Sequence, residues 1–162
     1  MNLRSRALPV FLLAALLAVP ASAKPLYGVV NHVTDGDTLW VRPAGGKPVQ
    51  VRIHGLDAPE ICQAFGREAR EALAARVLHR KVRVSIRAQD AYQRSVAKVS
   101  VDGQDVGAWL VARGFAWSAH DRGAGPYALE QAQARQAKLG LWASSSVEPR
   151  IFRRRHGPCN AS

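Results

Sequence analysis

The sequence predicts an α+β fold that is mainly β, with a five-stranded Greek-key barrel of the OB type and three helices. Two observations lead to this prediction. Apolar and polar residues alternate in five short runs, and a helical period replaces the alternation after the third run. The resulting order of three strands, a helix and two strands is typical of such a barrel. An α+β sheet with helices on one face also fits this order, so the pattern alone leaves both architectures open.

The five alternating runs are expected to be strands. The first three are separated by Asp-Gly and Gly-Gly pairs, which are strong turn signals, so these runs should form a meander of two hairpins. The predicted strands are residues 26–33, 37–42, 49–53, 82–87 and 95–101.

Three segments are expected to be helical. In the first, apolar residues recur at three- and four-residue steps. A glycine directly follows each of the other two, as is common where helices end, and Pro126 stands suitably early in the last. The predicted helices are residues 66–79, 106–113 and 126–139.

The N-terminal segment, residues 1–23, has the features of a cleaved signal peptide. Arg4 and Arg6 precede an apolar run that is short for a membrane span, and Ala21-Ser22-Ala23 suits a cleavage site. A retained membrane anchor is the alternative. We therefore expect a secreted or periplasmic protein that has no stable membrane association after cleavage. We also expect the protein to be a monomer.

The remaining chain is expected to form one domain, residues 24–146, followed by a basic tail, residues 147–162. The formal net charge of +11 favours polyanionic partners, either nucleic acid or an anionic membrane surface. Part of this charge lies in the tail, at Arg150 and at the run Arg153-Arg154-Arg155. The tail could be a solvated terminus or a nucleic-acid contact, and the sequence favours neither.

The chain has two cysteines, Cys62 and Cys159. An even number of cysteines in an exported protein suggests a disulfide, so we expect a bond that ties the tail to the loop at 60–66. The loop closed by this bond has about 100 residues, for which the chain-entropy account allows roughly 4–5 kcal/mol of stabilisation.

Acidic and basic residues interrupt the strand pattern at one end of the predicted sheet. Asp35 and Asp37 flank the first turn, Arg52 is near the end of the third strand, and Asp57 and Glu60 follow it. Pairing of the second and third strands should bring Asp37 beside residue 54 or so, close to the loop with the other two acids. Each acid alone could be a turn residue.

Such a cluster has a specific chemical use if its members converge. Carboxylates at close range repel one another unless a cation such as Ca²⁺ or Mg²⁺, or an arginine, compensates their charge. A metal ion and an arginine both suit the charge that develops on phosphoryl oxygens, and a free carboxylate can orient or deprotonate water. The cluster therefore predicts phosphodiester hydrolysis.

Several spaced motifs resemble the staphylococcal nuclease (thermonuclease) family, in the same order and over about residues 26–143. The motifs are VTDGDT at 33–38, VRIHGLDAPE at 51–60, GREA at 66–69, DAYQR at 90–94 and GLW at 140–142. The resemblance implies an OB-type barrel with three helices. It also implies Ca²⁺-dependent cleavage of DNA and RNA that breaks the bond to the 5′ oxygen and leaves a 3′-phosphate.

The resemblance further implies a role for each residue of the cluster. Asp37 and Asp57 would be metal ligands together with the backbone carbonyl of Ala58, and Asp35 would stand in the outer shell. In the substrate half of the site, Glu60 would act as general base. Arg52 and Arg94 would hold the phosphate, and Tyr92 would lie near the bound nucleotide.

The sequence departs from the family pattern at three places. Ala58 replaces a threonine, so a backbone ligand survives but a hydroxyl contact is lost. Gln93 replaces the glycine before Arg94, which would cost roughly 1 kcal/mol if that position needs a positive φ. The loop between Glu60 and Gly66 is short and contains Cys62.

A non-catalytic nucleic-acid-binding module of the same fold is the alternative function. A fold by itself implies no activity, and a binding module would lack its catalytic groups. All five of the charged residues expected in metal binding and catalysis are present, which favours an enzyme: Asp37, Arg52, Asp57, Glu60 and Arg94.

Overall fold

The structure is a computed structural model that describes residues 24–119, 124–157 and 159. The predicted signal peptide, residues 1–23, lies outside the described residues. Within them, no helix is both long and apolar enough to cross a membrane.

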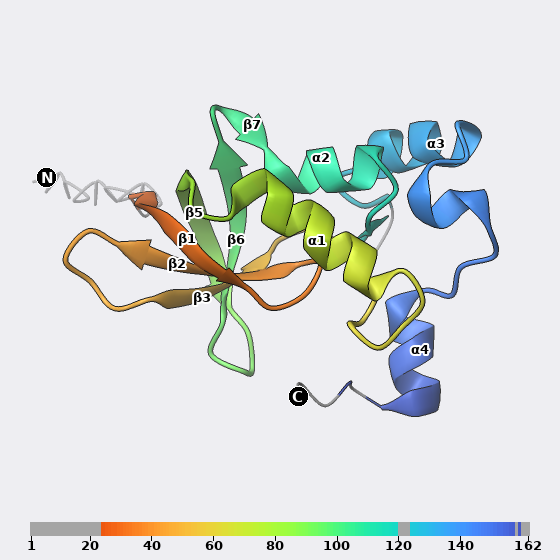
Figure 1. The fold of residues 1–162 in the computed structure, drawn as a ribbon, viewed down its shortest axis with the longest axis horizontal. Coiled ribbons are helices and arrows are strands. Elements are labelled where there is room, and N and C mark those ends of the chain that lie inside the picture. The colour runs from red at the N-terminus through yellow and green to blue at the C-terminus, as the bar shows by residue number, and fades with distance from the viewer. Residues whose placement is uncertain (1–23, 120–123, 158, 160–162) are drawn as a thin grey trace, which may run out of the picture.

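Five strands form a closed barrel, as predicted (Figure 1). Neighbouring strands pair antiparallel around the barrel, and a parallel pairing of the third strand with β6 closes it. That pairing joins Val51 to Ser95 and Ile53 to Ala97, and it decides against the open sheet. The barrel strands are β1 (Leu26–Val33), β2 (Thr38–Pro43), β3 (Val49–Ile53), β5 (Lys81–Gln89) and β6 (Ser95–Val101).

Three strands of two residues each were not predicted, because two residues are too few to show an alternating pattern. β7 extends the sheet at β6, while β4 and β8 pair with each other outside the barrel. They are β4 (Leu56–Asp57), β7 (Gln104–Asp105) and β8 (Trp117–Ser118). β5 also runs further than predicted, through an exposed half that pairs with β6.

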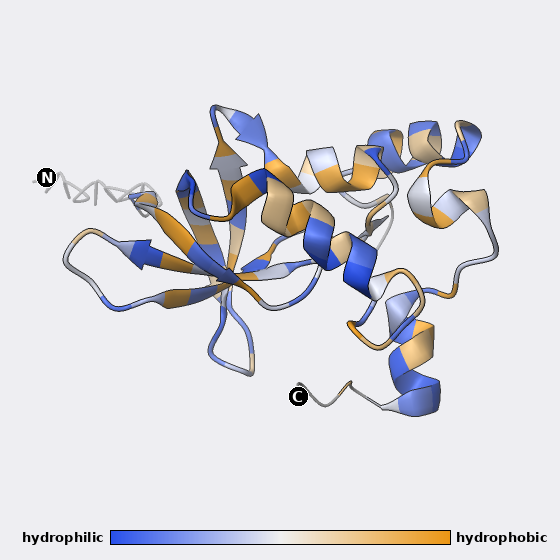
Figure 2. Cartoon of the chain, in the orientation of Figure 1, coloured by the Kyte–Doolittle hydropathy of each residue, from blue (hydrophilic) through white to orange (hydrophobic). Residues whose placement is uncertain are grey.

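The barrel interior is filled by the alternating apolar residues of its strands, whose side chains are essentially inaccessible to solvent. Figure 2 shows the corresponding bands of hydrophobic and hydrophilic residues along the strands. These side chains include Val30, Leu39, Val41, Val51, Ile53, Val82, Val84, Val99 and Val101.

The three predicted helices are present with shorter ends. Ala69, Leu73 and Val77 form the fully buried stripe of the first helix, at the four-residue spacing that the sequence predicted. The helices are α1 (Gly66–Val77), α2 (Val106–Ala112) and α3 (Ala128–Gln136), and a short 3-10 helix, η1 (Gly140–Ala143), follows them.

A fourth α-helix, α4 (Pro149–His156), lies in the segment that we expected to be a basic tail. Pro149 occupies the first turn, where its missing N–H costs no hydrogen bond, and it is buried. Ile151 and Phe152 are half-buried, whereas Figure 2 shows α4 as largely hydrophilic. A helix of eight residues is too short to be stable alone, so tertiary contacts must hold it.

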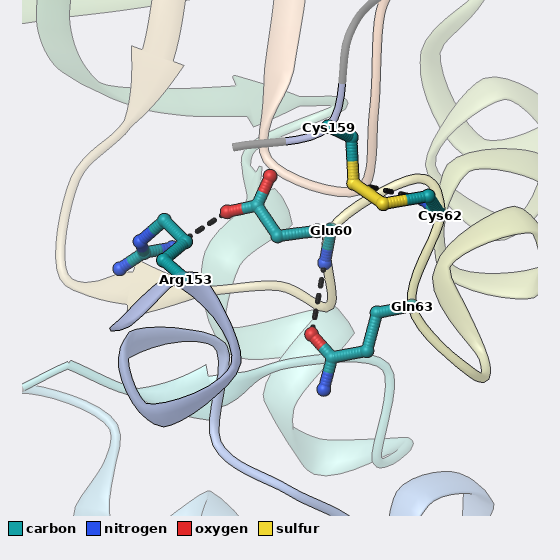
Figure 3. The surroundings of a disulfide bond; sticks show 5 residues. All are labelled: Glu60, Cys62, Gln63, Arg153 and Cys159. Carbon is teal, nitrogen blue, oxygen red and sulfur yellow. Dashed lines mark hydrogen bonds and ion pairs between the residues drawn. A yellow bond between two sulfur atoms is a disulfide. The ribbon is translucent and has the colours of Figure 1, made fainter. Parts of the chain in front are cut away.

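The predicted disulfide between Cys62 and Cys159 is present, with 5.8 Å between the two Cα atoms. It joins positions 97 residues apart and fastens the chain after α4 to the loop that precedes α1. Figure 3 shows this bond beside Glu60 and Arg153. The short loop and the C-terminal helix therefore form one linked unit.

Candidate functional site

The turn between β1 and β2 holds Asp37 in a buried position. The carboxylate of Asp35 accepts a hydrogen bond from the Asp37 backbone N–H (2.9 Å), an arrangement that stabilises a tight turn. Gly36 lies between them, where a β-carbon would stand 2.7 Å from the Ala58 side chain and 2.8 Å from that of Ala69. A larger residue would push the turn away, so glycine lets both acids approach the Ala58 loop.

The β2–β3 hairpin brings Arg52 to Asp37. Thr38 pairs with Arg52, and the Ile53 N–H donates to the Asp37 carbonyl oxygen (2.8 Å), within about one residue of the predicted register. The two Nη groups of Arg52 then bridge the acids: Nη1 donates to Asp37 Oδ1 (3.2 Å) and Nη2 to Asp57 Oδ1 (3.0 Å). One guanidinium thus joins the two predicted metal ligands.

The β4–β8 pair orients the loop with Asp57. Leu56 pairs with Ser118 and Asp57 with Trp117, which anchors this loop against the helical half of the domain. The Ala58 N–H donates to Asp37 Oδ2 (3.3 Å). The backbone of Ala58 is therefore adjacent to the Asp37 carboxylate, as a shared site would require.

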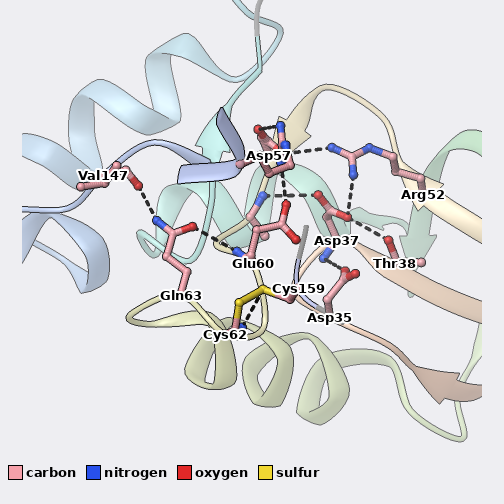
Figure 4. Close-up of polar contacts among 12 residues, drawn as sticks. Asp35, Asp37, Thr38, Arg52, Asp57, Glu60, Cys62, Gln63, Val147 and Cys159 are labelled. Carbon is pink, nitrogen blue, oxygen red and sulfur yellow. Dashed lines mark hydrogen bonds and ion pairs between the residues drawn. A yellow bond between two sulfur atoms is a disulfide. The ribbon is translucent and has the colours of Figure 1, made fainter. Parts of the chain in front are cut away.

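Glu60 is held through its own backbone. Its N–H donates to Gln63 Oε1 (3.2 Å), and its carbonyl accepts from the Gln63 N–H (2.8 Å). Gln63 Nε2 also donates to the Val147 carbonyl (2.5 Å), so the chain before α4 braces this loop. Figure 4 shows these contacts next to the acidic residues Asp35, Asp37 and Asp57.

Arg52 compensates only part of the negative charge of the neighbouring aspartates. The positive charge of Arg52 lies between the acids, and the Asp37 carboxylate is the main cause of the raised pKa of Arg52. Burial, and then the neighbouring Asp37 charge, raise the pKa of Asp35 to about 7. The site thus has more negative charge than Arg52 alone neutralises.

The turn between β5 and β6 contributes further residues to the site. Asp90 accepts hydrogen bonds from the N–H groups of Tyr92 (2.9 Å) and Arg94 (3.0 Å), and it pairs with Arg94 Nε at 2.7 Å. Desolvation opposes ionisation of Asp90, but these bonds, led by the Arg94 side chain, outweigh it and lower its pKa. Gln93 has a φ of 62°, so the predicted strain is present.

Asp90 has a positioning role that the sequence did not reveal. In the sequence Asp90 is only the first residue of the DAYQR motif, and an acid before a turn is ordinarily a turn residue. Its bond to Nε orients the Arg94 guanidinium, which lies 5.2 Å from the centre of the Tyr92 ring. Tyr92 itself is 79% exposed, as a residue that contacts a bound nucleotide would need to be.

One open cavity of about 480 Å³ unites most of these groups. Seven of the eight predicted site residues line it, and Asp57 instead lines an adjoining cavity of about 410 Å³ on the other side of Arg52. The seven are Asp35, Asp37, Arg52, Ala58, Glu60, Tyr92 and Arg94.

Arg153 of α4 also lines both cavities, and nothing in the sequence assigned it to the site. It donates to Asp57 from both Nη groups, at 3.2 Å to Oδ1 and 3.0 Å to Oδ2, and to Glu60 Oε1 at 2.7 Å. The hydrogen bond with Asp57 is the main cause of its raised pKa. The solvated-tail interpretation is therefore wrong for this residue. The one feature of the sequence that could have placed Arg153 near Glu60 is the predicted bond between Cys62 and Cys159, which ties the C-terminal segment to the 60–66 loop.

The donor set suits a hard cation. Asp37, Asp57 and the Ala58 carbonyl would supply oxygen ligands only, which is the chemistry of Ca²⁺ and Mg²⁺ sites. The described residues contain no group of three or more His, Cys, Asp or Glu side chains arranged to hold a metal ion. The expected set has only two such side chains, since its third ligand is a backbone carbonyl.

Residues 50–144 match the family model described as staphylococcal nuclease homologue, over more than half of the chain. The chain belongs to the staphylococcal nuclease family. Among its relatives, an uncharacterized endonuclease of Haemophilus influenzae is 36% identical over 127 residues, which cover 77% of this chain and 71% of the relative. Protein ParB of Escherichia coli is 39% identical (87% and 89% covered), and a micrococcal nuclease of Shigella flexneri is 34% identical (86% and 86% covered).

This staphylococcal nuclease homologue has parts of its site outside the matched segment. Asp35 and Asp37 precede residue 50, and Arg153 follows residue 144. The acids are joined to the matched segment by the β2–β3 pairing, and Arg153 is joined to it by the disulfide. Tertiary structure thus completes the site at both ends.

Proposed function

We propose that this staphylococcal nuclease homologue hydrolyses the phosphodiester bonds of DNA or RNA in a Ca²⁺-dependent reaction that leaves 3′-phosphate ends. One observation carries the proposal. Arg52 bridges Asp37 and Asp57 within 3.2 Å, and Glu60 and Arg94 line the same cavity as Arg52. Phosphoryl transfer needs this combination of anion-binding arginines, oxygen ligands and a carboxylate that can accept a proton.

The residues that would hold Ca²⁺ are Asp37, Asp57 and the carbonyl of Ala58. Their adjacency is supported by the Ala58 N–H bond to Asp37 Oδ2 and by the shared Arg52 contact. A bound cation would neutralise charge on the phosphoryl oxygens and lower the pKa of a coordinated water. Asp35 would act in the outer shell, because it fixes the backbone of the turn that presents Asp37.

Two arginines of the chain would bind the phosphate. Arg52 carries the planar fork that matches phosphate oxygens, and it is only about a quarter exposed. Arg94 is bonded to Asp90 through Nε, and among the described residues its Nη groups make no hydrogen bond or ion pair. These Nη groups would therefore be available to stabilise the charge that builds up on the phosphate.

Glu60 would accept the proton of the attacking water. The water oxygen would form a bond to phosphorus, the bond from phosphorus to the 5′ oxygen would break, and the released 5′ oxygen would take up a proton. Glu60 suits this task because its backbone is fixed by Gln63 while its side chain faces the cavity. Tyr92 would lie against the nucleotide, since it is exposed at the cavity edge.

The deciding experiment is cleavage of end-labelled single-stranded DNA by purified protein, with Ca²⁺ and with a chelator. We expect calcium-dependent cleavage whose products are extended by a polymerase only after phosphatase treatment. Glu60→Gln should lower the rate on the order of 10²–10⁴-fold, and Glu68→Gln, an exposed acid of α1, is the matched control. Salt-sensitive binding without cleavage under any divalent metal would instead support the binding-module alternative.

We also propose that the protein is exported after removal of residues 1–23 and acts as a monomer. The disulfide supports export, because such bonds persist in oxidising compartments. Mass spectrometry of the protein recovered from the cell envelope and medium would give the mature N-terminus. A retained leader would support the membrane-anchor alternative, and light scattering on the mature protein would give its oligomeric state.

A further inference from the structure

Arg153 occupies the carboxylates that the proposed function assigns to metal binding and catalysis. Both oxygens of Asp57 are engaged: Oδ1 accepts from Arg52 (3.0 Å) and Arg153 (3.2 Å), and Oδ2 from Arg153 (3.0 Å). Asp37, in contrast, bonds to Arg52 and the Ala58 N–H but not to Arg153. A cation that binds Asp57 would therefore compete with two guanidinium groups for this carboxylate and would be repelled by their positive charge.

The contact is too well built to be a chance approach of a surface arginine. The Asp57 side chain is 16% exposed and that of Glu60 is 23% exposed, so these ion pairs are partly shielded from solvent. Charge-assisted bonds of this kind, and bidentate ones above all, are the stronger hydrogen bonds in proteins. The neighbouring arginines of α4, Arg154 and Arg155, are exposed and make no ion pair within the described residues.

Two tethers hold α4 in place, one on each side of Arg153. Before the helix, the Val147 carbonyl accepts a hydrogen bond from Gln63. After the helix, Cys159 is bonded to Cys62. Both partners belong to the loop that presents Glu60, so Arg153 is held at a high effective concentration beside the acids.

We propose that Arg153 is a further active-site residue that competes with a divalent cation for the Asp57 carboxylate and thereby sets the affinity of the site for that cation. The disulfide increases this competition by restraining α4. The inference rests on the proposed function, because it assumes that Asp57 binds a cation. Removal of Arg153 leaves Asp57 and Glu60 with less compensating charge, and a cation then replaces the lost partner.

The test is calorimetric titration of Ca²⁺ into the oxidised protein without substrate, so that binding is measured independently of activity. We expect Arg153→Gln to bind Ca²⁺ about tenfold more tightly than wild type. Arg154→Gln removes the same charge from an exposed position of the same helix and should bind as wild type does. Thermal melting of each variant reports whether it is folded.

Two further variants separate direct competition from general charge. Arg153→Lys keeps the charge but loses the planar fork, so it should bind Ca²⁺ more tightly than wild type and less tightly than Arg153→Gln. The double variant Cys62→Ser, Cys159→Ser should also bind Ca²⁺ more tightly than wild type. When these two substitutions are combined with Arg153→Gln, the Ca²⁺ affinity should rise no further than in Arg153→Gln alone, because the disulfide acts through Arg153.

Equal Ca²⁺ affinity of wild type and Arg153→Gln would overturn the inference and leave the proposed function intact. An equal shift in Arg154→Gln would also overturn it, because the effect would then be one of net charge. If no variant binds Ca²⁺, the calcium dependence itself fails and the inference fails with it. Should Arg153→Gln not fold, Arg153→Lys and the cysteine variant decide, and an unchanged affinity in both overturns the inference.

Discussion

Gly66 lies so close to Glu60 that a β-carbon at position 66 would stand 2.0 Å from the Glu60 carbonyl oxygen. No real β-carbon approaches an oxygen this closely, so any other residue would force the loop apart. The first residue of α1 therefore packs directly against the backbone of the proposed general base, and helix and loop fix each other.

We predict that Gly66→Ala will displace Glu60 and destabilise the fold by about 1–3 kcal/mol, as overpacking of a filled site does. Cleavage should fall together with stability. Urea denaturation and initial rates measure the two effects. Gly46→Ala is the control, since its β-carbon would lie an ordinary 3.4 Å from Pro43, and equal behaviour of the two variants would contradict the prediction.

Arg52→Lys should be a poor enzyme although it keeps the positive charge. Lysine has a single ammonium group, which cannot bridge Asp37 and Asp57 as the two Nη groups do, and it binds phosphate as a point charge. We expect kcat/KM to fall about tenfold or more, since one charge-assisted hydrogen bond is worth about 1.5–3 kcal/mol. Near-normal kinetics would argue against a bidentate contact.

Loss of the disulfide should destabilise the protein substantially. The bond joins positions 97 residues apart, for which the chain-entropy account allows about 4–5 kcal/mol. The double variant Cys62→Ser, Cys159→Ser should therefore unfold at a lower denaturant concentration than the oxidised wild type. Reduced wild type serves as the control, and an unchanged midpoint in both would show that the bond contributes little.

Relief of backbone strain at Gln93 should stabilise the protein. Gln93 and Lys138 both have left-handed backbone conformations, with φ of 62° and 52°. Replacement of either by glycine should raise the free energy of unfolding by up to about 1 kcal/mol, the cost of that conformation for a residue with a β-carbon. Lys138→Gly tests the effect away from the cavity, and a loss of stability in both variants would refute the strain argument.

The local pattern of the sequence was enough to predict the five barrel strands and the first three helices. Val30, Leu39 and Val51 are buried because alternate residues of a strand face the same side, and this period is visible without a structure. The acids around Arg52 could be brought together from hairpin geometry, because the register of a short hairpin follows from its turn. The disulfide could be predicted because the chain has only two cysteines.

Only the tertiary structure decided how the barrel closes and what the C-terminal segment does. The pairing of Val51 with Ser95 joins strands distant in sequence, and no local period encodes it. The helix that carries Arg153 is too short and too polar to be predicted from its own residues, because its stability comes from contacts with the 60–66 loop. Whether an arginine is solvated or bound to Asp57 depends on that packing, since its charge alone is compatible with both.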